Sequence, residues 1–451
     1  MCSSWNAKEL LRSALLCVFL FAAPLIAQAQ QERLDVDTAR DLIFSLLQQG
    51  QPAAAADAAR AVLTARPDDI PALLGLTQAL IGMGQSAEAA RTGQRAWSLA
   101  TVPEDRFASA MVTAQALARS NRKLLAQFWL RRAFQAAPSP IAKAAAARDL
   151  RQLRSITPLR VQLDFDVEPS SNINGGARSD RFFGGTIGGT SLALSGVAYT
   201  ASADLTYSLP ARGRRLDALK LNGIWRTYTL SDEAKRIAPD ARGSDFEYQE
   251  IEVAWEATYL LPRGRFSHEI TLGRSWSGGE DLERFIGADL FWSRAISDRQ
   301  RLTLGYEFED QDRLDTSIRS STLHGVSIGW VQGTEPGIWA LSARIADKDS
   351  DSAIVANVGR SVSVSFIPRE PFVGTANRFS AIYEERDFDE EIIFGLRRDH
   401  TTQLSLDITF GGVDYYGFSP TLDLTARRTE STIDLYDADT FSIGFGLTSL
   451  F

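Results

Sequence analysis

The chain is poor in the residues that redox and metal chemistry require. Its 451 residues include two cysteines and three histidines. Both cysteines, Cys2 and Cys17, lie at the N-terminal end, so the remainder contains no disulfide, no thiolate metal site and no cysteine nucleophile. Three scattered histidines also disfavour a histidine metal cluster. We therefore expect a protein without a metal or another cofactor.

Long apolar runs are scarce too. One run, 14–23, follows two basic residues and precedes small residues at positions 27 and 29, the layout of a secretory signal peptide over residues 1–29. The run is shorter than the ~20 residues of a membrane-spanning helix, so a cleaved leader is expected rather than an anchor. No later stretch reaches about 18 uninterrupted apolar residues. The sequence predicts export to the periplasm or outer membrane of a diderm bacterium.

Charge is distributed unevenly along the chain, whose net charge is −8. Residues 30–155 contain 16 basic and 11 acidic residues, whereas residues 156–451 contain 30 basic and 44 acidic residues. This asymmetry predicts two regions with different tasks. The acidic second region argues against a nucleic-acid ligand.

Residues 30–155 are predicted to form a periplasmic helical domain. They are rich in alanine and leucine, with apolar residues at helical spacing. Gly50 and Gly84 lie 34 residues apart, and three Arg-Ala-apolar triplets, each followed by a proline, recur at spacings of 35 and 37 residues. These periods resemble tetratricopeptide repeats, which stack helix pairs of about 34 residues into a solenoid. An ordinary helical bundle is the alternative.

We expect about three such helix pairs and a last helix near Ile141–Ile156. The concave face of a solenoid of this kind binds proteins and has no chemistry of its own. Arg131 and Arg132 are candidates for that face, with solvated helix positions as the alternative.

Residues 156–451 change from the helical period to alternation of apolar and polar residues. Leu159, Val161 and Leu163 alternate with polar residues, and similar runs occur at 250–259 and 301–309. Each run is about ten residues long, enough to cross a bilayer at a tilt, whereas soluble sandwiches usually have strands of ~5–6 residues. In lipid, only a closed barrel satisfies every backbone group. We predict a 14-stranded antiparallel outer-membrane β-barrel with strands starting near residues 159, 197, 216, 248, 266, 284, 301, 321, 338, 355, 376, 399, 418 and 440.

The polar residues of the alternating runs include many carboxylates that are expected to face the barrel lumen. With an even number of strands, the first strand would begin and the last strand would end on the same side of the membrane, the periplasmic side. The carboxylates either select what passes or merely solvate an aqueous interior. They are Asp164, Asp204, Glu250, Glu252, Glu256, Glu269, Asp289, Glu307, Asp407 and Asp423.

The last strand ends in a terminal aromatic residue. Phe451 is preceded at alternate positions by Leu447 and Phe445, with Gly446 between them. This pattern resembles the signal that the outer-membrane assembly machinery reads, so that machinery is an expected partner. Ser449 departs from the pattern, where an apolar residue is usual.

Two histidines have neighbours that catalysis could use, but strand geometry separates them. His268 lies beside Glu269, and His400 lies beside Asp399. Consecutive residues of a strand point to opposite faces, so these neighbours do not form a catalytic dyad. No Gly-rich lysine motif for ATP is found either. We expect a protein that is not an enzyme.

Two short motifs complete the pattern. Pro169-Ser170-Ser171-Asn172-Ile173-Asn174 ends the first predicted strand, and Arg398-Asp399 opens the twelfth. Together with the leader, the small helical domain and the fourteen strands, they resemble the surface lipoprotein assembly modulators, the Slam family. The roles of the individual motif residues stay unassigned, and a structural role is favoured.

The resemblance implies a translocator that helps deliver particular lipoproteins or secreted proteins from the periplasm to the cell surface. The helical domain of such a protein would engage the substrate or its periplasmic chaperones, and we expect a monomer. A polysaccharide exporter and a nutrient or cation porin are the alternatives. An exporter of anionic polymers requires a basic lumen, which the acidic set above disfavours.

Overall fold

The structure is a computed structural model that describes residues 35–182, 184–372, 374–392, 395–413 and 415–450. The predicted signal peptide and the terminal Phe451 lie outside these residues. The chain divides into two compact units, the first ending at Asn121 and the second beginning at Arg122. None of the described helices is long and apolar enough to cross a membrane.

The first unit contains five described helices whose boundaries follow local sequence signals. A proline occupies one of the first two positions of α3, α4 and α6, where its missing N–H is harmless. Gly50 and Gly84 have positive φ values of 71° and 77° in the turns that follow α2 and α4. The helices are α2 (Val36–Gln48), α3 (Pro52–Ala65), α4 (Ile70–Gly82), α5 (Ser86–Leu99) and α6 (Pro103–Arg119).

Small residues form the interfaces between these helices. Ala55, Ala59 and Ala72 are fully buried. Gly75 of α4 lies so close to Ile43 of α2 that an added Cβ would be 2.5 Å from the Cγ2 atom of Ile43. Helix α4 also contacts both α2 and α6 beyond its chain neighbours. This is the packing of stacked helix pairs, as the sequence period predicted.

Asp69 caps helix α4 and links it to α2. Its carboxylate accepts a hydrogen bond from the N–H of Ala72 at 3.0 Å and an ion pair from Arg40 at 2.5 Å. The Asp69 side chain is only 1% exposed. Burial alone would raise the pKa of Asp69, but the hydrogen bonds from Arg40 and Ala72 outweigh it and hold the pKa below its usual value.

The second unit begins with helices α7 (Lys123–Ala136) and α8 (Pro140–Ser155), which pack on one another. Helix α8 matches the predicted last helix. Fourteen long strands follow, and each starts within four residues of its predicted position: β1 (Leu159–Ser170), β4 (Gly196–Ser208), β5 (Arg215–Leu230), β6 (Tyr248–Leu261), β7 (Gly264–Ser277), β8 (Glu280–Ser297), β9 (Gln300–Arg313), β10 (Ser321–Gly333), β11 (Gly337–Ser350), β12 (Asn357–Pro368), β13 (Ala376–Ile392), β14 (Gly395–Thr409), β15 (Phe418–Ser431) and β16 (Ala438–Leu450).

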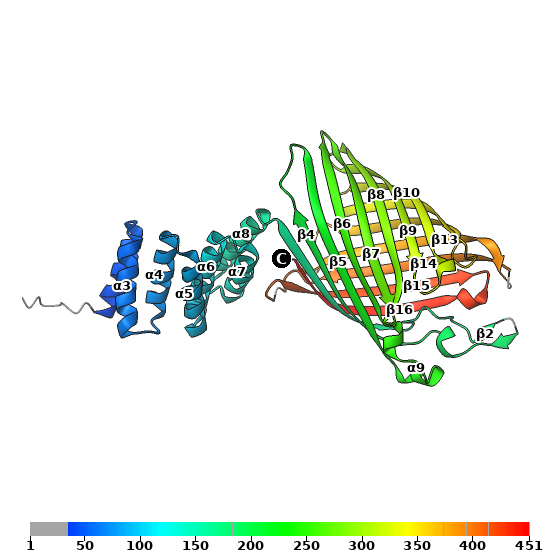
Figure 1. The fold of residues 1–451 in the computed structure, drawn as a ribbon, viewed down its shortest axis with the longest axis horizontal. Helices are drawn as coiled ribbons and strands as arrows, with labels where there is room; N and C mark the ends of the chain where they lie inside the picture. The colour runs from blue at the N-terminus through cyan, green and yellow to red at the C-terminus, as the bar shows by residue number, and fades with distance from the viewer. Residues whose placement is uncertain (1–34, 183, 373, 393–394, 414, 451) are drawn as a thin grey trace, which may run out of the picture. The chain divides into compact units, whose positions relative to one another are not determined.

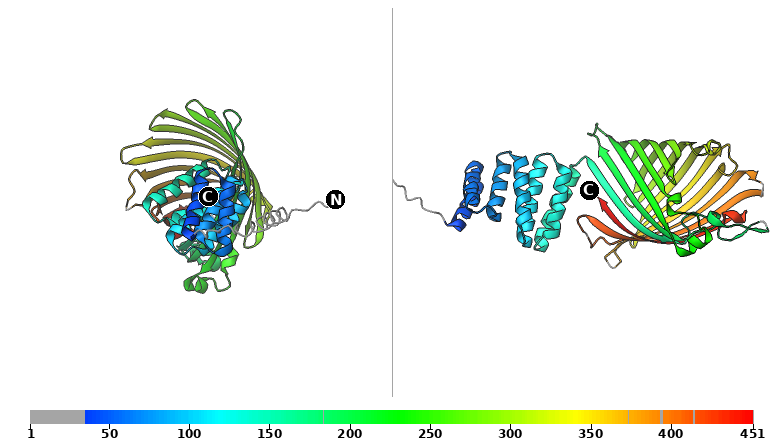
Figure 2. Two further views of the ribbon diagram at one scale, coloured as in Figure 1. Left: turned by 90° about the vertical axis from the view of Figure 1, so that its left-hand side faces the viewer. Right: turned by 60° about the horizontal axis from the view of Figure 1, so that its bottom comes forward.

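These strands form a closed antiparallel barrel. Each pairs with its sequence neighbours, and β1 pairs with both β4 and β16, which completes the ring. Figures 1 and 2 show the tilted strands of the wall. The short strands β2 (Arg181–Phe182) and β3 (Gly185–Thr186) pair separately. The predicted fold class, tetratricopeptide-like helices followed by a 14-stranded antiparallel barrel, is confirmed.

The two faces of the wall differ in chemistry. Directly paired residues share a face, so the register divides each strand into two sets. One set is mainly apolar and exposed, as at Val253 (53%), Leu272 (57%) and Leu404 (56%). The other set contains most of the charged side chains and faces the lumen. Hydrophobic residues therefore point outward, opposite to their place in the helical unit.

The two ends of the barrel also differ. We call the end where β1 begins and β16 ends the near end, and the opposite end the far end. Two long far-end loops, 171–195 and 231–247, pack together through a cluster around Leu194 and Leu230. The second loop contains α9 (Asp232–Ile237), which lies with β2 below the strands in Figure 1.

Candidate functional site in the barrel lumen

Four carboxylates form a row across the middle of the lumen wall. Glu256, Glu269, Asp289 and Glu307 stand directly opposite one another on the adjacent strands β6 to β9. Lys220 on β5 contacts Glu256 at 2.7 Å and Glu269 at 2.5 Å. Cross-strand like charges repel, and the lysine relieves that repulsion at one end of the row.

At the other end of this row, a glycine on the neighbouring strand leaves room for the last carboxylate to form an ion pair. Glu307 on β9 pairs with Arg344 on β11, across the intervening strand β10. Gly325 on β10 lies directly opposite Glu307. A Cβ at Gly325 would be 2.7 Å from both Cγ and Cδ of Glu307. The missing side chain therefore leaves the space in which the carboxylate reaches Arg344.

A second carboxylate group lies on β14, β15, β1 and β4. Asp407 and Asp423 are directly opposite one another. Asp166 lies over Gly446 of β16, where an added Cβ would collide with its carboxylate. Asp164 and Asp204 follow on β1 and β4. Within the part of the chain that the structure describes, none of these five aspartates is in an ion pair. Their charge is therefore directed to the lumen.

All ten carboxylates that the sequence suggested belong to the lumen-facing set. Sequence reasoning missed Asp166, Glu168, Glu283 and Glu309 of the same set, although the same alternation contains them. It also missed the cations between them. The lumen-facing side chains are therefore mixed in charge rather than uniformly acidic.

Most of the missed cations line two cavities toward the far end. The larger has a volume of about 610 Å³, and Arg226, Arg386 and Arg427 line it together with many hydroxyl groups. The second, of about 380 Å³, is lined by Arg313 and Lys348 among others. Arg386 and Arg397 line both cavities. The lumen therefore combines the acidic residues predicted from the sequence with a cation-rich wall at these two cavities.

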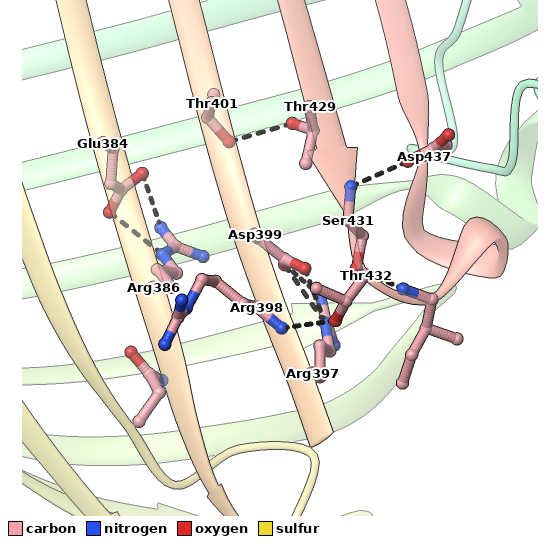
Figure 3. A network of polar contacts seen from close by, with 12 residues as sticks. Glu384, Arg386, Arg397, Arg398, Asp399, Thr401, Thr429, Ser431, Thr432 and Asp437 are labelled. Carbon is pink, nitrogen blue, oxygen red and sulfur yellow. Dashed lines mark hydrogen bonds and ion pairs between the residues drawn. The ribbon is translucent and has the colours of Figure 1, made fainter. Parts of the chain in front are cut away.

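Arg397 is held firmly at the centre of this wall. Its guanidinium carbon lies 3.4 Å from the ring centroid of Tyr436 and 4.1 Å from that of Phe388. The same group donates to both carboxylate oxygens of Asp399 at 2.6–3.1 Å. Asp399 is buried. Cation–π and bidentate contacts together fix this side chain, and Figure 3 shows the network around it.

The structure separates the two residues of the Arg398-Asp399 motif. Asp399 faces the lumen, whereas Arg398 belongs to the outward set and pairs with Asp387. The backbone N–H of Arg398 also donates to the hydroxyl of Thr432 at 2.9 Å. The partner of Asp399 is therefore Arg397, a residue that sequence reasoning did not select.

The motif Pro169–Asn174 connects β1 to the first far-end loop. The side chain of Asn172 donates to the carbonyl of Gly176 at 2.9 Å and accepts from its N–H at 3.0 Å. Asn174 bonds the loop again, accepting from the N–H of Leu194 at 2.9 Å. Ile173 packs between them against the far-end cluster. Asn172 lines the same cavity as Asp399, so the structure brings the two motifs together.

The histidines that catalysis might have used belong to the outward set. His268 packs edge-on against Trp255 at 5.2 Å between ring centroids. The Nδ1 atom of His400 lies 3.0 Å from the hydroxyl of Tyr383. Asp399 and His400 lie on opposite faces of β14, as the alternation requires.

The proposed assembly signal is described only in part. Phe445 and Leu447 belong to the outward set and are exposed, whereas Gly446 faces the lumen. Phe451 lies outside the described residues. Ser449 is buried.

The structure covers one of the two arginines proposed for a concave binding face. Arg131 is buried and donates to the carbonyl of Tyr416, in the loop between β14 and β15, at 3.3 Å. Arg132 covers the rings of Phe128 and Trp129. Arg131 therefore does not lie on an open face, because a distant loop covers it.

Comparison with known proteins finds similarities to each of the two parts of the chain. A tetratricopeptide repeat family model matches residues 46–111. No curated protein sequence matches the chain. The solved structure of OccAB3 from Acinetobacter baumannii is 7% identical, with 66% of this chain and 99% of that chain covered and a TM-score of 0.38. A FadL homologue from Pseudomonas aeruginosa is 12% identical, with 66% and 90% covered and a TM-score of 0.35.

A third solved structure resembles the helices. The type III secretion translocator chaperone SycD from Yersinia enterocolitica is 20% identical, with 27% of this chain and 90% of that chain covered and a TM-score of 0.25. The architecture itself rests on the helix packing and strand pairing described above.

Proposed function

We propose that this chain is an outer-membrane translocator that helps deliver specific lipoproteins or secreted proteins from the periplasm to the cell surface. The observation that carries the proposal is a closed fourteen-strand barrel, apolar outside and charged inside, joined to tetratricopeptide-like helices. An apolar outer face suits lipid, and closure leaves no unpaired strand edge. The helices supply a surface of the kind that binds proteins.

In this proposal the helices face the periplasm. The chain passes from α8 directly into β1 at the near end, where β16 also ends, so the near end of the barrel faces the periplasm in this proposal. The substrate or its chaperone binds the helices and enters the lumen from there. The chain works as a monomer without catalysis, after insertion by the outer-membrane assembly machinery.

Surface exposure of candidate substrates tests the proposal. Protease added to intact cells should digest a specific lipoprotein or secreted protein only when this chain is present. A variant that lacks α2 to α6 should insert its barrel yet leave the substrate protected. The matched control is the full-length chain, inserted to the same level. Unchanged exposure of every surface protein after deletion of the whole chain would overturn the proposal.

A polysaccharide-export or porin-like channel is the second candidate, and the size and polarity of the far-end cavities are compatible with it. Cavities of several hundred Å³ with polar walls can accept sugars or ions as well as peptide segments. Purified protein in planar bilayers separates these functions. A large, stable conductance without any exported protein would favour the channel over a protein conduit.

A further inference from the structure

The two cavities in the far half of the lumen are lined by more cations than carboxylates. Eight cationic side chains but only three carboxylates line the two cavities there. The carboxylates are Glu168, Glu384 and Asp399. The cations are Arg226, Arg313, Arg319, Arg344, Lys348, Arg386, Arg397 and Arg427.

Two of the carboxylates are already engaged by arginines of the same wall. Asp399 binds Arg397 at 2.6 Å, and Glu384 binds Arg386 at 2.9 Å. Arg226 donates to the hydroxyl of Thr200 at 3.0 Å. Among the described residues, neither Arg226 nor Arg427 is in an ion pair. Both guanidinium groups line the larger cavity without an ion pair, and the charge of Arg226 also acts on the carboxylate of Asp166.

The remaining lining can bind a polar backbone. Thr401 and Thr429 place their hydroxyls 2.9 Å apart on neighbouring strands, and Gln403 lies directly opposite Arg427. Guanidinium groups bind planar carboxylates through two parallel hydrogen bonds, which gives both charge and orientation. Hydroxyl and amide groups supply the donors and acceptors that a peptide backbone requires.

The aromatic residues argue against a sugar as the main ligand. Sugar rings commonly bind on an exposed aromatic face, and of the three aromatic side chains in these linings, Tyr228, Phe388 and Tyr436, Arg397 covers a face of the last two. We propose that the far-end cavities bind an acidic peptide segment, with Arg226 and Arg427 as its principal contacts. The assignment of that segment to an exported protein rests on the function proposed above.

The charge order along the strands gives this site a direction. On β15, Asp423 and Arg427 share the lumen-facing set, and Arg427 lies about 13 Å nearer the far end. On β14, Asp407 lies toward the near end and Arg397 toward the far end. Along these two strands, an acidic segment is therefore repelled near Asp407 and Asp423 and retained at the larger cavity. That difference opposes its return toward the near end.

Binding of a labelled decaglutamate peptide to the full chain in detergent micelles tests the inference. Fluorescence anisotropy should detect binding that weakens as salt is raised, because charge carries it. The double variant Arg226→Gln/Arg427→Gln should raise the Kd at least tenfold, about 1.4 kcal/mol. The control Arg428→Gln removes an adjacent arginine of the outward set and should change the Kd less than twofold. An unchanged Kd in the double variant would overturn the site.

Two further measurements test the role of the guanidinium group and the chemical class of the ligand. Arg427→Lys keeps the charge but removes the guanidinium fork, so it should weaken binding about threefold and does not depend on the folding of the double variant. An oligogalacturonate with the same number of carboxylates competes for the site; displacement at a lower concentration than unlabelled decaglutamate would overturn the peptide assignment. The surface-exposure assay tests the proposed function separately. If the surface exposure of every candidate substrate is unchanged after deletion of the chain, the translocator function is contradicted. The peptide site is tested by the Kd values alone.

Discussion

The helical unit and the barrel orient their apolar side chains in opposite directions, inward in the helical unit and outward in the barrel. In the helices, leucine and alanine meet one another at the interfaces, as with the fully buried Leu80 and Ala79 of α4. In the barrel, leucines such as Leu272 and Leu404 point outward, and charged side chains fill the lumen. The helical unit is thus stabilised by a dry core, whereas the barrel requires an apolar surrounding for its outer face. Both satisfy their backbone groups, one within helices and one around a closed ring.

The largest expected effect is in the helical core. Leu80→Ala removes a side chain with 0% exposure, and the cavity it leaves should lower the free energy of unfolding of the helical unit by about 2–5 kcal/mol. Thermal unfolding followed by helical circular dichroism measures this. The control Leu42→Ala changes a residue of α2 that is 40% exposed, and it should change stability by under about 1 kcal/mol. Equal losses in both variants would contradict the buried interface between the helices.

The barrel should respond to polarity on its outer face rather than to lost volume. Leu272→Arg places a charge where we expect lipid and should destabilise the barrel in bilayers by about 2–4 kcal/mol. Leu272→Ala should have a small effect, because no dry core is emptied. Denaturant unfolding in lipid vesicles measures both. A barrel that tolerates the arginine as well as the alanine would remove the argument that this face contacts lipid.

Alternation explains why so much of the barrel could be predicted. A strand with one apolar face and one polar face must alternate apolar and polar residues over its whole length. The starts of the strands and the lumen-facing carboxylates could therefore be predicted directly from the sequence. The same rule also divides the Arg398-Asp399 motif between the two faces of the wall. Counting back from Asp407 in steps of two reaches Asp399 and then Arg397, so Arg398 must face outward.

Contacts between distant segments could not be predicted in this way. Arg397 is clamped by Phe388 and Tyr436, and the second of these comes from a loop beyond the following strand. Arg131 is covered by a loop that is separated from it by 285 residues. No local pattern specifies such pairs, because they depend on how the closed ring brings its loops together. The helical period predicted the helices but could not show which arginines stay open.

A single ion pair in the helical unit predicts that the stability of this unit depends on pH. The pKa of Asp69 is lower in the folded chain than its ordinary value of 3.8, so folding is favoured by the ionised form. Its contribution is present above that ordinary value and is lost as the pH falls through the folded pKa. Arg40→Gln should reduce stability at pH 7 by about 1–3 kcal/mol, since a buried carboxylate loses its partner. The difference between the two proteins should shrink below pH 4, and a constant difference down to pH 2 would contradict the linkage.

The smallest expected effect lies in the lumen, where solvent screens charges that the helical core would hold tightly. Gly325→Ala places a methyl group against the carboxylate of Glu307 and should displace it from Arg344. Because Glu307 and Arg344 are about one third exposed, the loss of their ion pair should cost about 0.2–1 kcal/mol. The control Gly329→Ala lies on the same strand and face, and its added Cβ would make only ordinary contacts at 3.7 Å or more. Denaturant unfolding of both variants in vesicles, alongside Glu307→Gln and the double variant Gly325→Ala/Glu307→Gln, tests the ion pair. If the double variant loses no more stability than Glu307→Gln alone, the glycine acts through this carboxylate. If the two losses of stability add, it does not.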